Sequence, residues 1–541
     1  MIRMKILFLA SLLFFFSKVA ISQVAGFTST NLPLVVINTN GQTIQDASKV
    51  SASMKLIYNG TGKVNTPADA GNVYNGPIGI EFHGGSSDPA KQNSYSFETR
   101  NSSGDNQNVS LLGMPSENDW ILLASYNDKS FIRNALAFQL FRKMGHYAPR
   151  TQTVEVIVNN EYMGIYTLTE KIKQDKGRVD ISKLTSADIS GDNLTGGYIF
   201  RVDTYDANDS WQGNFAPYKH PELAVYYSYD DPSAGNLVSQ QKNYLKTAVN
   251  SFESVLYGSG FASTSTGYPA WIKMNSFLDF FIVSEVSRNM DAYRKNCYYF
   301  KNKDSKDNKF HSGPVWNFDV AFKNLETDCS AYSATDGSGW AYQINECAGL
   351  KSYSNGWIVR LLEDPAFKNA LYSRYTLMRS TYISNNYLNN FVDSVKNLVS
   401  EAQARHYNKW KILETKAGPN EVDPQPATYQ GHVDKLKTWI QTRLNWLDVH
   451  IPGNPSGTHD IESAISYRIF PNPASDILYL ESSSEIQEYK VFSLNGSLLK
   501  LGNGINSYSA EMNVSDLRQG IYLVQIKTKD NRVLNSKFAV Q

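Results

Sequence analysis

The residues best suited to chemistry lie between positions 284 and 324, in the run SEVSRNMDAYRKNCYYFKNKDSKDNKFHSGPVWNFDVAFKN. Asp291 is followed five positions later by Asn296, and Asp319 comes after two strand-like runs. Phosphoryl transfer uses one carboxylate to receive a hydroxyl proton, with an amide oxygen and a second carboxylate on Mg²⁺. The same spacing occurs in solvated turns that Asx side chains cap, so both interpretations stay open.

A turn that could hold phosphate precedes this run. IGIEFHGGSS ends in Gly84, Gly85, Ser86 and Ser87, and the strand SYSFETR follows it. Backbone amides of a Gly/Ser turn between strands can surround phosphate oxygens. An ordinary hairpin turn is the alternative.

The elements that must position these groups are strands first and helices later. Strand-like runs begin near residue 30, and one helix is expected after Asp128 or Ser130, which can cap it, ending at Gly145. A hairpin with alternating Val154, Val156 and Val158 follows. Apolar residues at helical spacing dominate from about residue 270.

The predicted class is therefore α+β, with a two-lobed protein-kinase-like plan and ATP in the cleft between the lobes. The helix FLDFFIVSEV is expected to lead to Asp291, and strands are expected at 297–300 and in GPVWNF. Lys129 and Arg133, at the start of the first helix, could face the phosphates or could be solvated charges.

Composition bounds the possibilities. The 541 residues suggest about three domains, and 33 Tyr with 26 Phe allow a sizeable core. A net charge of +1 gives no reason to expect nucleic acid as a partner. Residues 1–22 have the basic, apolar and small-residue regions of a signal peptide, and no later segment predicts an integral membrane span.

Three cysteines occur, and their spacing matches no zinc pattern. In an exported protein Cys329 and Cys347 could form a disulfide, leaving Cys297 as a buried thiol. The sequence does not decide this point.

A second composition begins after the Pro/Gly/Ser linker PGNPSGTH. YRIFPNPASDILYLES, EYKVFSLNGSLL and QGIYLVQIKTKDNRVLNSKFAV are short alternating strands separated by turns. They predict a small all-β sandwich without catalytic groups.

Residues from about 30 to 450 resemble the CotH protein-kinase family of secreted kinase-like proteins. The resemblance is carried by IGIEFHGGSS with SYSFETR, LLGMPSENDWILLASYNDKSFIRN, YAPRTQTVEVIVNNEYMGIYTLTEKI and GPVWNFDVAF. It implies a β-rich N-lobe at about 24–180 and a helical C-lobe at about 265–450, within a kinase-like domain at 24–450.

The resemblance also implies roles. Asp291 would orient the acceptor hydroxyl, and Asn296, Asn317 and Asp319 would hold Mg²⁺. The ATP phosphates and hinge would involve Gly84, Gly85, Ser86, Ser87, Lys91, Lys129, Arg133, Glu170 and Lys171. Glu170 and Lys171 could equally be a surface pair.

Four positions depart from the family pattern. His83 replaces an Arg, Asn93 a Lys, Asn317 an Asp and Lys323 a Gly. An amide neutralises Mg²⁺ less than a carboxylate does. If 317 and 319 belong to a strand, their side chains share one face, and Asp319 could take over.

Residues 464–541, after a linker at 451–463, resemble the type A C-terminal sorting domain of the type IX secretion system. PNPASDILYL, YKVFSLNGSLL and GIYLVQIKT carry this resemblance. It implies a Bacteroidota-type bacterium, the type IX machinery as a partner, and a secreted or cell-surface location. A substrate-binding sandwich is the alternative.

Two functions follow as hypotheses. One is an exported protein kinase that uses ATP and Mg²⁺ to phosphorylate Ser or Thr of secreted or surface proteins. The alternative is a catalytically impaired kinase-like scaffold that acts in binding or adhesion. Polysaccharide hydrolysis is disfavoured because no carboxylate pair at a suitable separation is recognisable.

Overall fold

The computed structural model describes residues 27–46, 48–84, 88, 91–324, 329, 332, 334–417, 421–453, 467–493, 497–529 and 533–541. The predicted signal peptide and most of the predicted linker lie outside these residues. The chain divides into two compact units, one of residues 1–368 with 382–452 and one of 369–381 with 453–541.

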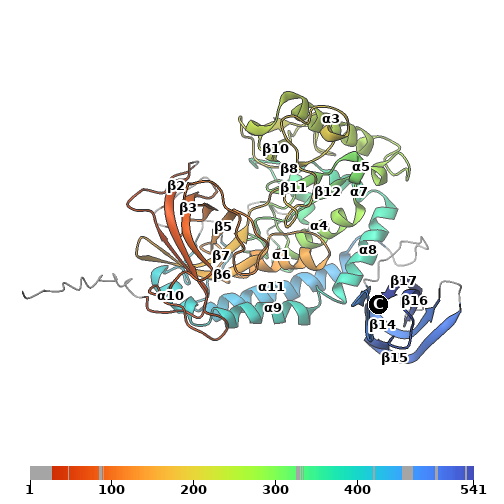
Figure 1. Ribbon diagram of the computed structural model, residues 1–541. Helices are drawn as coiled ribbons and strands as arrows, with labels where there is room; N and C mark the ends of the chain where they lie inside the picture. The colour runs from red at the N-terminus through yellow and green to blue at the C-terminus, as the bar shows by residue number, and fades with distance from the viewer. Residues whose placement is uncertain are drawn as a thin grey trace, which may run out of the picture. The chain divides into compact units, whose positions relative to one another are not determined.

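The N-terminal strands of the first unit form a closed barrel (Figure 1). Its order is β1-β2-β3-β4-β5-β7-β6, and the parallel pairing of β1 with β6 closes it. Val154, Val156 and Val158 lie in its buried core, as their alternation predicts. The strands are β1 (Leu34–Asn38), β2 (Val50–Ile57), β3 (Tyr74–Phe82), β4 (Tyr95–Thr99), β5 (Asp119–Ala124), β6 (Thr151–Val158) and β7 (Glu161–Glu170).

The β6–β7 hairpin turns at Asn159 and Asn160, both with positive φ, as hairpin turns of two residues require. In β7 the register shifts beside Gly164, whose φ is +100°. A Cβ at this position would lie 2.7 Å from Nδ1 of His406 in α10 (Ala402–Lys409). Glycine here therefore allows α10 to pack directly on the barrel.

Helix α1 (Arg133–Lys143) is the helix predicted after Asp128. The Asp128 carboxylate accepts hydrogen bonds from the backbone amides of Ile132 (3.0 Å) and Arg133 (2.8 Å). Gly145, with φ of +99°, follows its end. The capping carboxylate and the terminating glycine are thus confirmed.

A second sheet has the order β12-β11-β8-β10-β9 and draws on distant parts of the chain. Strand β11 confirms the predicted run at 297–300. The strand predicted in GPVWNF, at residues 313–318, is wrong: β12 stops at Ser312, and residues 313–318 form no strand. The strands are β8 (Tyr198–Val202), β9 (Ser210–Gln212), β10 (Tyr226–Asp231), β11 (Cys297–Lys301) and β12 (Phe310–Ser312).

Helix α4 (Met274–Ser287) is buried along almost its whole length and contacts α1 and α11. It is the apolar helix predicted to lead to Asp291. Figure 1 shows α1, α9 and α11 close to one another in the same unit. The remaining helices are α2 (Gly191–Leu194), α3 (Ser239–Tyr257), α5 (Asp304–Asp307), α7 (Trp357–Leu361), α8 (Pro365–Arg379), α9 (Asn385–Leu398) and α11 (Tyr429–His450).

The C-terminal strands confirm an all-β domain. They are hydrogen-bonded into one sheet in which β14 pairs with β13, β15 and β16, and β16 pairs with β17. Register shifts in β14 mark bulges, which bend a strand. The strands are β13 (Tyr467–Phe470), β14 (Ile477–Phe492), β15 (Leu498–Asn513), β16 (Gly520–Thr528) and β17 (Val533–Val540).

Mixed helix and sheet content confirms the α+β class, and the kinase-like division into two lobes stays a prediction. No helix in the described part of the chain is both long and apolar enough to cross a bilayer.

Candidate functional site

Asp291 follows α4 directly. The helix ends at Arg288, whose φ of +46° is left-handed. The Asn289 side chain accepts a hydrogen bond from the Asp291 amide (3.1 Å) and donates one to the Asn317 carbonyl (3.1 Å). Asn289 therefore joins the Asp291 loop to the segment that contains Asp319.

The Asp291 carboxylate is almost buried and forms an ion pair with Arg294, at 2.6 Å from Oδ1. Arg294 also contacts the Ser352 hydroxyl (3.3 Å). No hydrogen bond to Oδ2 of Asp291 is present among the described residues. One carboxylate oxygen is thus fixed and the other is available to a ligand.

Asp319 lies against the start of α1. Its Oδ2 accepts a hydrogen bond from Asn127 Nδ2 (3.0 Å), and Asn324 donates to both the Asp319 carbonyl (2.7 Å) and the Asn127 carbonyl (2.6 Å). Its Oδ1 is buried without a hydrogen-bond partner among the described residues. Burial raises the pKa of Asp319, and the charges of Asp128 and Asp291 raise it further.

Although 28 sequence positions separate Asp291 from Asp319, the charges of Asp291 and Asp128 both disfavour the ionised form of Asp319. A buried carboxylate oxygen without a partner is costly unless a cation binds it. Asp319 thus fits a divalent cation. Within the described ranges, no three His, Cys, Asp or Glu side chains form a group that could hold a metal.

Asn296 lies in the loop before β11, where the sequence predicts it, whereas Asn317 lacks the strand backbone that the sequence predicts. Their φ values are +53° and +63°, so both are left-handed. Residue 317 lies outside any strand, so the expectation that strand alternation places Asn317 and Asp319 on one face is wrong. Neither side-chain amide makes a hydrogen bond within the described part of the structure, which leaves both oxygens open to a ligand.

Lys129 and Arg133 face protein groups. The buried Lys129 ammonium forms an ion pair with Glu421 (3.0 Å) and hydrogen bonds to Gln425 Oε1 (2.8 Å) and the Thr415 carbonyl (2.6 Å). Burial lowers its pKa. Thr415, Glu421 and Gln425 thus occupy this lysine.

Arg133 is also buried. It donates to Asp128 Oδ1 (2.6 Å) and to the Ala321 carbonyl (3.1 Å). It therefore fastens α1 to the segment that carries Asp319, which is a positioning contact.

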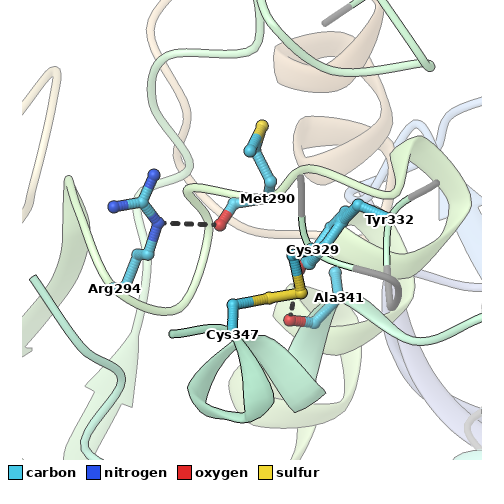
Figure 2. Close-up of a disulfide and its surroundings, with 6 residues drawn as sticks. All are labelled: Met290, Arg294, Cys329, Tyr332, Ala341 and Cys347. Atoms are coloured by element: carbon cyan, nitrogen blue, oxygen red, sulfur yellow. Dashed lines mark hydrogen bonds between the residues drawn. A yellow bond between two sulfur atoms is a disulfide. The ribbon is translucent and has the colours of Figure 1, made fainter. Parts of the chain in front are cut away.

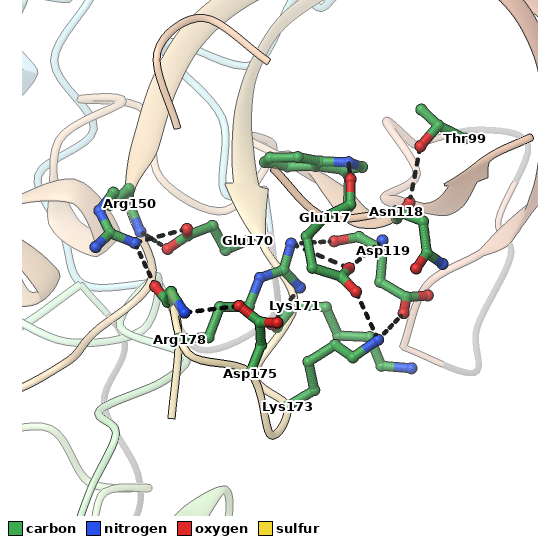
Figure 3. A network of polar contacts seen from close by, with 12 residues as sticks. Thr99, Glu117, Asn118, Asp119, Arg150, Glu170, Lys171, Lys173, Asp175 and Arg178 are labelled. Atoms are coloured by element: carbon green, nitrogen blue, oxygen red, sulfur yellow. Dashed lines mark hydrogen bonds and ion pairs between the residues drawn. The ribbon is translucent and has the colours of Figure 1, made fainter. Parts of the chain in front are cut away.

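Glu170 and Lys171, at the end of β7, have different environments (Figure 3). Glu170 is fully buried and pairs with Arg150 (2.7 Å). Lys171 is exposed, and its ammonium has no hydrogen bond or ion pair among the described residues. The two residues are therefore not a surface pair, and Lys171 is a cation available to an anionic ligand.

The charge of Lys171 also lowers the pKa of His83. Burial lowers the pKa of His83 to about 4, with contributions from Lys171 and Arg201, so this imidazole is neutral at pH 7. His83 Nδ1 lies 2.8 Å from Ser96 Oγ. The residue that replaces the family's arginine therefore supplies no charge.

The predicted phosphate-binding turn is described only at its edges. Gly84 has φ of +94°, as a tight turn requires, while Gly85, Ser86 and Ser87 lie outside the described residues. Lys91 pairs with Asp88 at the surface (3.3 Å). Asn93 closes a local ring with the Asp88 backbone, through two hydrogen bonds of 3.1 Å.

Sequence reasoning missed the residues that assemble the site. Asn289 stands two positions before Asp291, the spacing of an Asx turn, which was a usable local signal. Asn127 contacts Asp319 across 192 sequence positions, and Asn324 contacts the Asn127 carbonyl across 197, and no local pattern shows either contact.

The chain thus combines a closed barrel with a second, antiparallel sheet, and Asp319 has a buried carboxylate oxygen without a hydrogen-bond partner among the described residues. Residues 80–447 match the family model described as CotH kinase protein. The match spans most of the chain, which therefore belongs to the CotH kinase family.

Residues 468–541 match the model described as secretion system C-terminal sorting domain. This tail indicates export by the type IX secretion machinery to the cell surface or the extracellular space.

Among curated proteins, no match was found. One similar solved structure is CopC from Methylosinus trichosporium OB3b, with a TM-score of 0.12 and 12% identity, covering 15% of this chain and 90% of that chain. Another is a twitchin kinase region from C. elegans, with a TM-score of 0.16 and 10% identity, covering 92% and 98%. Scores this low support no argument about the fold.

Proposed function

We propose that this protein is an exported atypical protein kinase that transfers the γ-phosphoryl group of ATP to Ser or Thr hydroxyls of secreted or surface proteins. The observation that carries the proposal is the coupling of Asp291 to Asp319, whose buried Oδ1 has no partner among the described residues. The family membership supports the same chemistry. In this proposal the barrel forms one lobe and the second sheet with its helices forms the other.

Asp291 would orient the acceptor hydroxyl through Oδ2, because Arg294 holds Oδ1. A carboxylate fixed in this way acts by positioning the nucleophile, which supplies much of the catalysis in phosphoryl transfer. Mg²⁺, when bound, would neutralise charge on the transferred phosphoryl group. Asp319 Oδ1, with the amide oxygens of Asn296 and Asn317, would hold it.

Lys171 would attract the nucleotide in this proposal, because it is exposed and its ammonium has no hydrogen bond or ion pair among the described residues. Its position at the end of β7 puts it at the edge of the barrel.

A second candidate function is a kinase-like scaffold with impaired transfer, which binds a partner at the cell surface. The observation that favours it is the occupation of Lys129 by Glu421 and the replacement of a lysine by Asn93. Both changes reduce the positive charge that triphosphate requires.

Nucleotide binding separates the two. Thermal unfolding is followed while ATP and MgCl₂ are titrated, and ATP at a hundred times its Kd should stabilise the protein by about 2.7 kcal/mol. Transfer is then measured with γ-labelled ATP. Asp291→Asn should keep the stabilisation and lose the label, Asp319→Asn should lose both, and the exposed control Asp46→Asn should lose neither.

No stabilisation of the native protein by ATP and Mg²⁺ would favour the scaffold. Label that persists in Asp291→Asn would remove this residue from the mechanism.

A further inference from the structure

The candidate site rests against a loop that a disulfide closes. Cys329 and Cys347 are bonded, with 5.2 Å between their Cα atoms and a sequence separation of 18 (Figure 2). Within the loop, the Tyr332 hydroxyl donates to the Ala341 carbonyl (2.7 Å). Closing a loop of this length removes about 3 kcal/mol of conformational freedom from the unfolded chain in the entropic account. The disulfide that the sequence left undecided is thus present.

A buried ion pair fastens this loop to the helix that precedes Asp291. The Glu285 carboxylate accepts hydrogen bonds from the backbone amides of Ala341 and Tyr342, both at 2.9 Å. Arg443 pairs with Glu285 (3.0 Å) and donates to the Gly337 and Gly339 carbonyls (2.6 and 2.7 Å). The loop therefore has one fixed position on the end of α4.

The loop in turn holds both segments that carry the aspartates. Arg288, three residues before Asp291, donates to the Ala334 carbonyl (2.9 Å). Lys323, four residues after Asp319, donates to the Tyr332 carbonyl (2.5 Å).

Arg288 and Lys323 both have left-handed backbones, with φ of +46° and +51°. Such a conformation costs a residue other than glycine about 1 kcal/mol or more, and it persists only where the surroundings impose it. The loop carbonyls are part of those surroundings. Releasing the loop should therefore allow both segments to relax.

We propose that the Cys329–Cys347 disulfide makes the arrangement of the site depend on redox state. When the disulfide is formed, the loop holds Asp291 and Asp319 in their relative positions, and when it is reduced, the loop does not. Two thiols lose two protons and two electrons to a protein disulfide oxidant by thiol–disulfide exchange, and the S–S bond forms. The reducing cytoplasm opposes this step, so the site would assemble only after export. The consequence for catalysis rests on the proposed function, whereas the consequence for structure does not.

The third cysteine does not compete for this bond. Cys297 is fully buried at the start of β11, and its thiol donates to the Tyr299 hydroxyl (3.3 Å). Burial raises its pKa to about 12, which suppresses the thiolate that exchange requires. Oxidation of the three cysteines should therefore form the Cys329–Cys347 disulfide and leave Cys297 as a thiol.

Hydrogen exchange of the full chain tests the structural claim. The Phe322 amide donates to the Ser287 carbonyl (2.7 Å) and the Asn289 amide donates to the Ser284 carbonyl (3.0 Å), so these amides report on the two segments. Across redox buffers of rising potential, we expect their exchange to slow at least tenfold at the midpoint of the disulfide. Amides of β6, in the barrel, should change less than twofold.

The double variant Cys329→Ser/Cys347→Ser should behave, without reductant, as the reduced native protein does. Lys323→Gly keeps the disulfide and relieves one strained position, so it should reduce the redox effect at Phe322. Lys323→Gly also keeps the inference testable if the double serine variant fails to fold.

Unchanged exchange of the two amides on reduction would overturn the inference, because the disulfide would then have no effect on the site. An equal change in the β6 amides would also overturn it, because the disulfide would then act only on overall stability. Labelling from ATP should fall at least tenfold on reduction. If no label forms in either state while the two amides respond, the proposed function fails and the redox coupling stands.

Discussion

The Glu285–Arg443 pair gives the sharpest test of how the disulfide loop is attached. Arg443 is fully buried in α11, and its hydrogen bonds to other described residues include two to Glu285 and two to carbonyls of the loop. Arg443→Met keeps much of the volume and removes all four. The Glu285 carboxylate then keeps the Ala341 and Tyr342 amides and the Tyr293 hydroxyl, but it loses its cation.

Breaking one side of a buried ion pair typically costs about 3–5 kcal/mol, because a buried charge is left uncompensated. Burial already raises the pKa of Glu285, and Arg443 opposes that rise. Without Arg443 the folded pKa should rise further above the unfolded value. The folded state then binds the extra proton, so the loss of stability should be smaller at pH 5 than at pH 8.

Urea unfolding of the oxidised protein at both pH values measures this loss. In Arg443→Met/Glu285→Met the uncompensated charge is absent, so the double variant should lose less than the sum of the single variants, by about 1–3 kcal/mol. Lys396→Met, which removes a half-exposed partner of Asp393 at 3.4 Å, is the control and should cost less than about 1 kcal/mol. Additive losses that do not depend on pH would refute the reasoning.

Three further predictions concern buried charges. Asp319→Asn should abolish stabilisation by Mg²⁺. The variant should also make stability less sensitive to pH above 3.8, because the native carboxylate ionises at increasing cost as pH rises through its raised pKa. Mg²⁺ titrations at pH 5 and 8 check both expectations. Burial raises the pKa of Glu253 to about 7 from 4.5, so its contribution to stability should fall by about 3 kcal/mol as pH rises through this window, and Glu253→Gln should flatten that part of the unfolding curve. Lys129→Met should lower stability by about 3 kcal/mol with little change in ATP affinity, because the Lys129 ammonium pairs with Glu421 rather than with phosphate. A large loss of ATP affinity at unchanged stability would instead show that Lys129 binds the nucleotide.

Much of the fold is encoded in local patterns. The alternation of Val154, Val156 and Val158 predicted β6, and the carboxylate of Asp128 with Gly145 predicted the limits of α1. The closure of the barrel could not be predicted, because the β1–β6 pairing joins residues more than a hundred positions apart. Parallel pairing across such a distance leaves no periodic signal.

The site was predictable in its chemistry and less so in its geometry. The types and order of Asp291, Asn296 and Asp319 indicated the candidate groups, and in the structure the charge of Asp291 acts on Asp319. The predicted strand through residue 317 failed because Asn317 adopts a left-handed backbone, which Asn tolerates better than most residues. The partners of Lys129 lie nearly 300 positions away, so its burial could not be inferred from helix spacing.

The most direct test of the central claim is a crystal structure of the oxidised protein soaked with Mg²⁺ and a non-hydrolysable ATP analogue. The account predicts that Asp319 Oδ1 would be a ligand of the cation and that the Asp291 carboxylate would lie beside the terminal phosphate of the nucleotide. A nucleotide bound elsewhere, or a cation that leaves Asp319 Oδ1 without a ligand, would contradict the account.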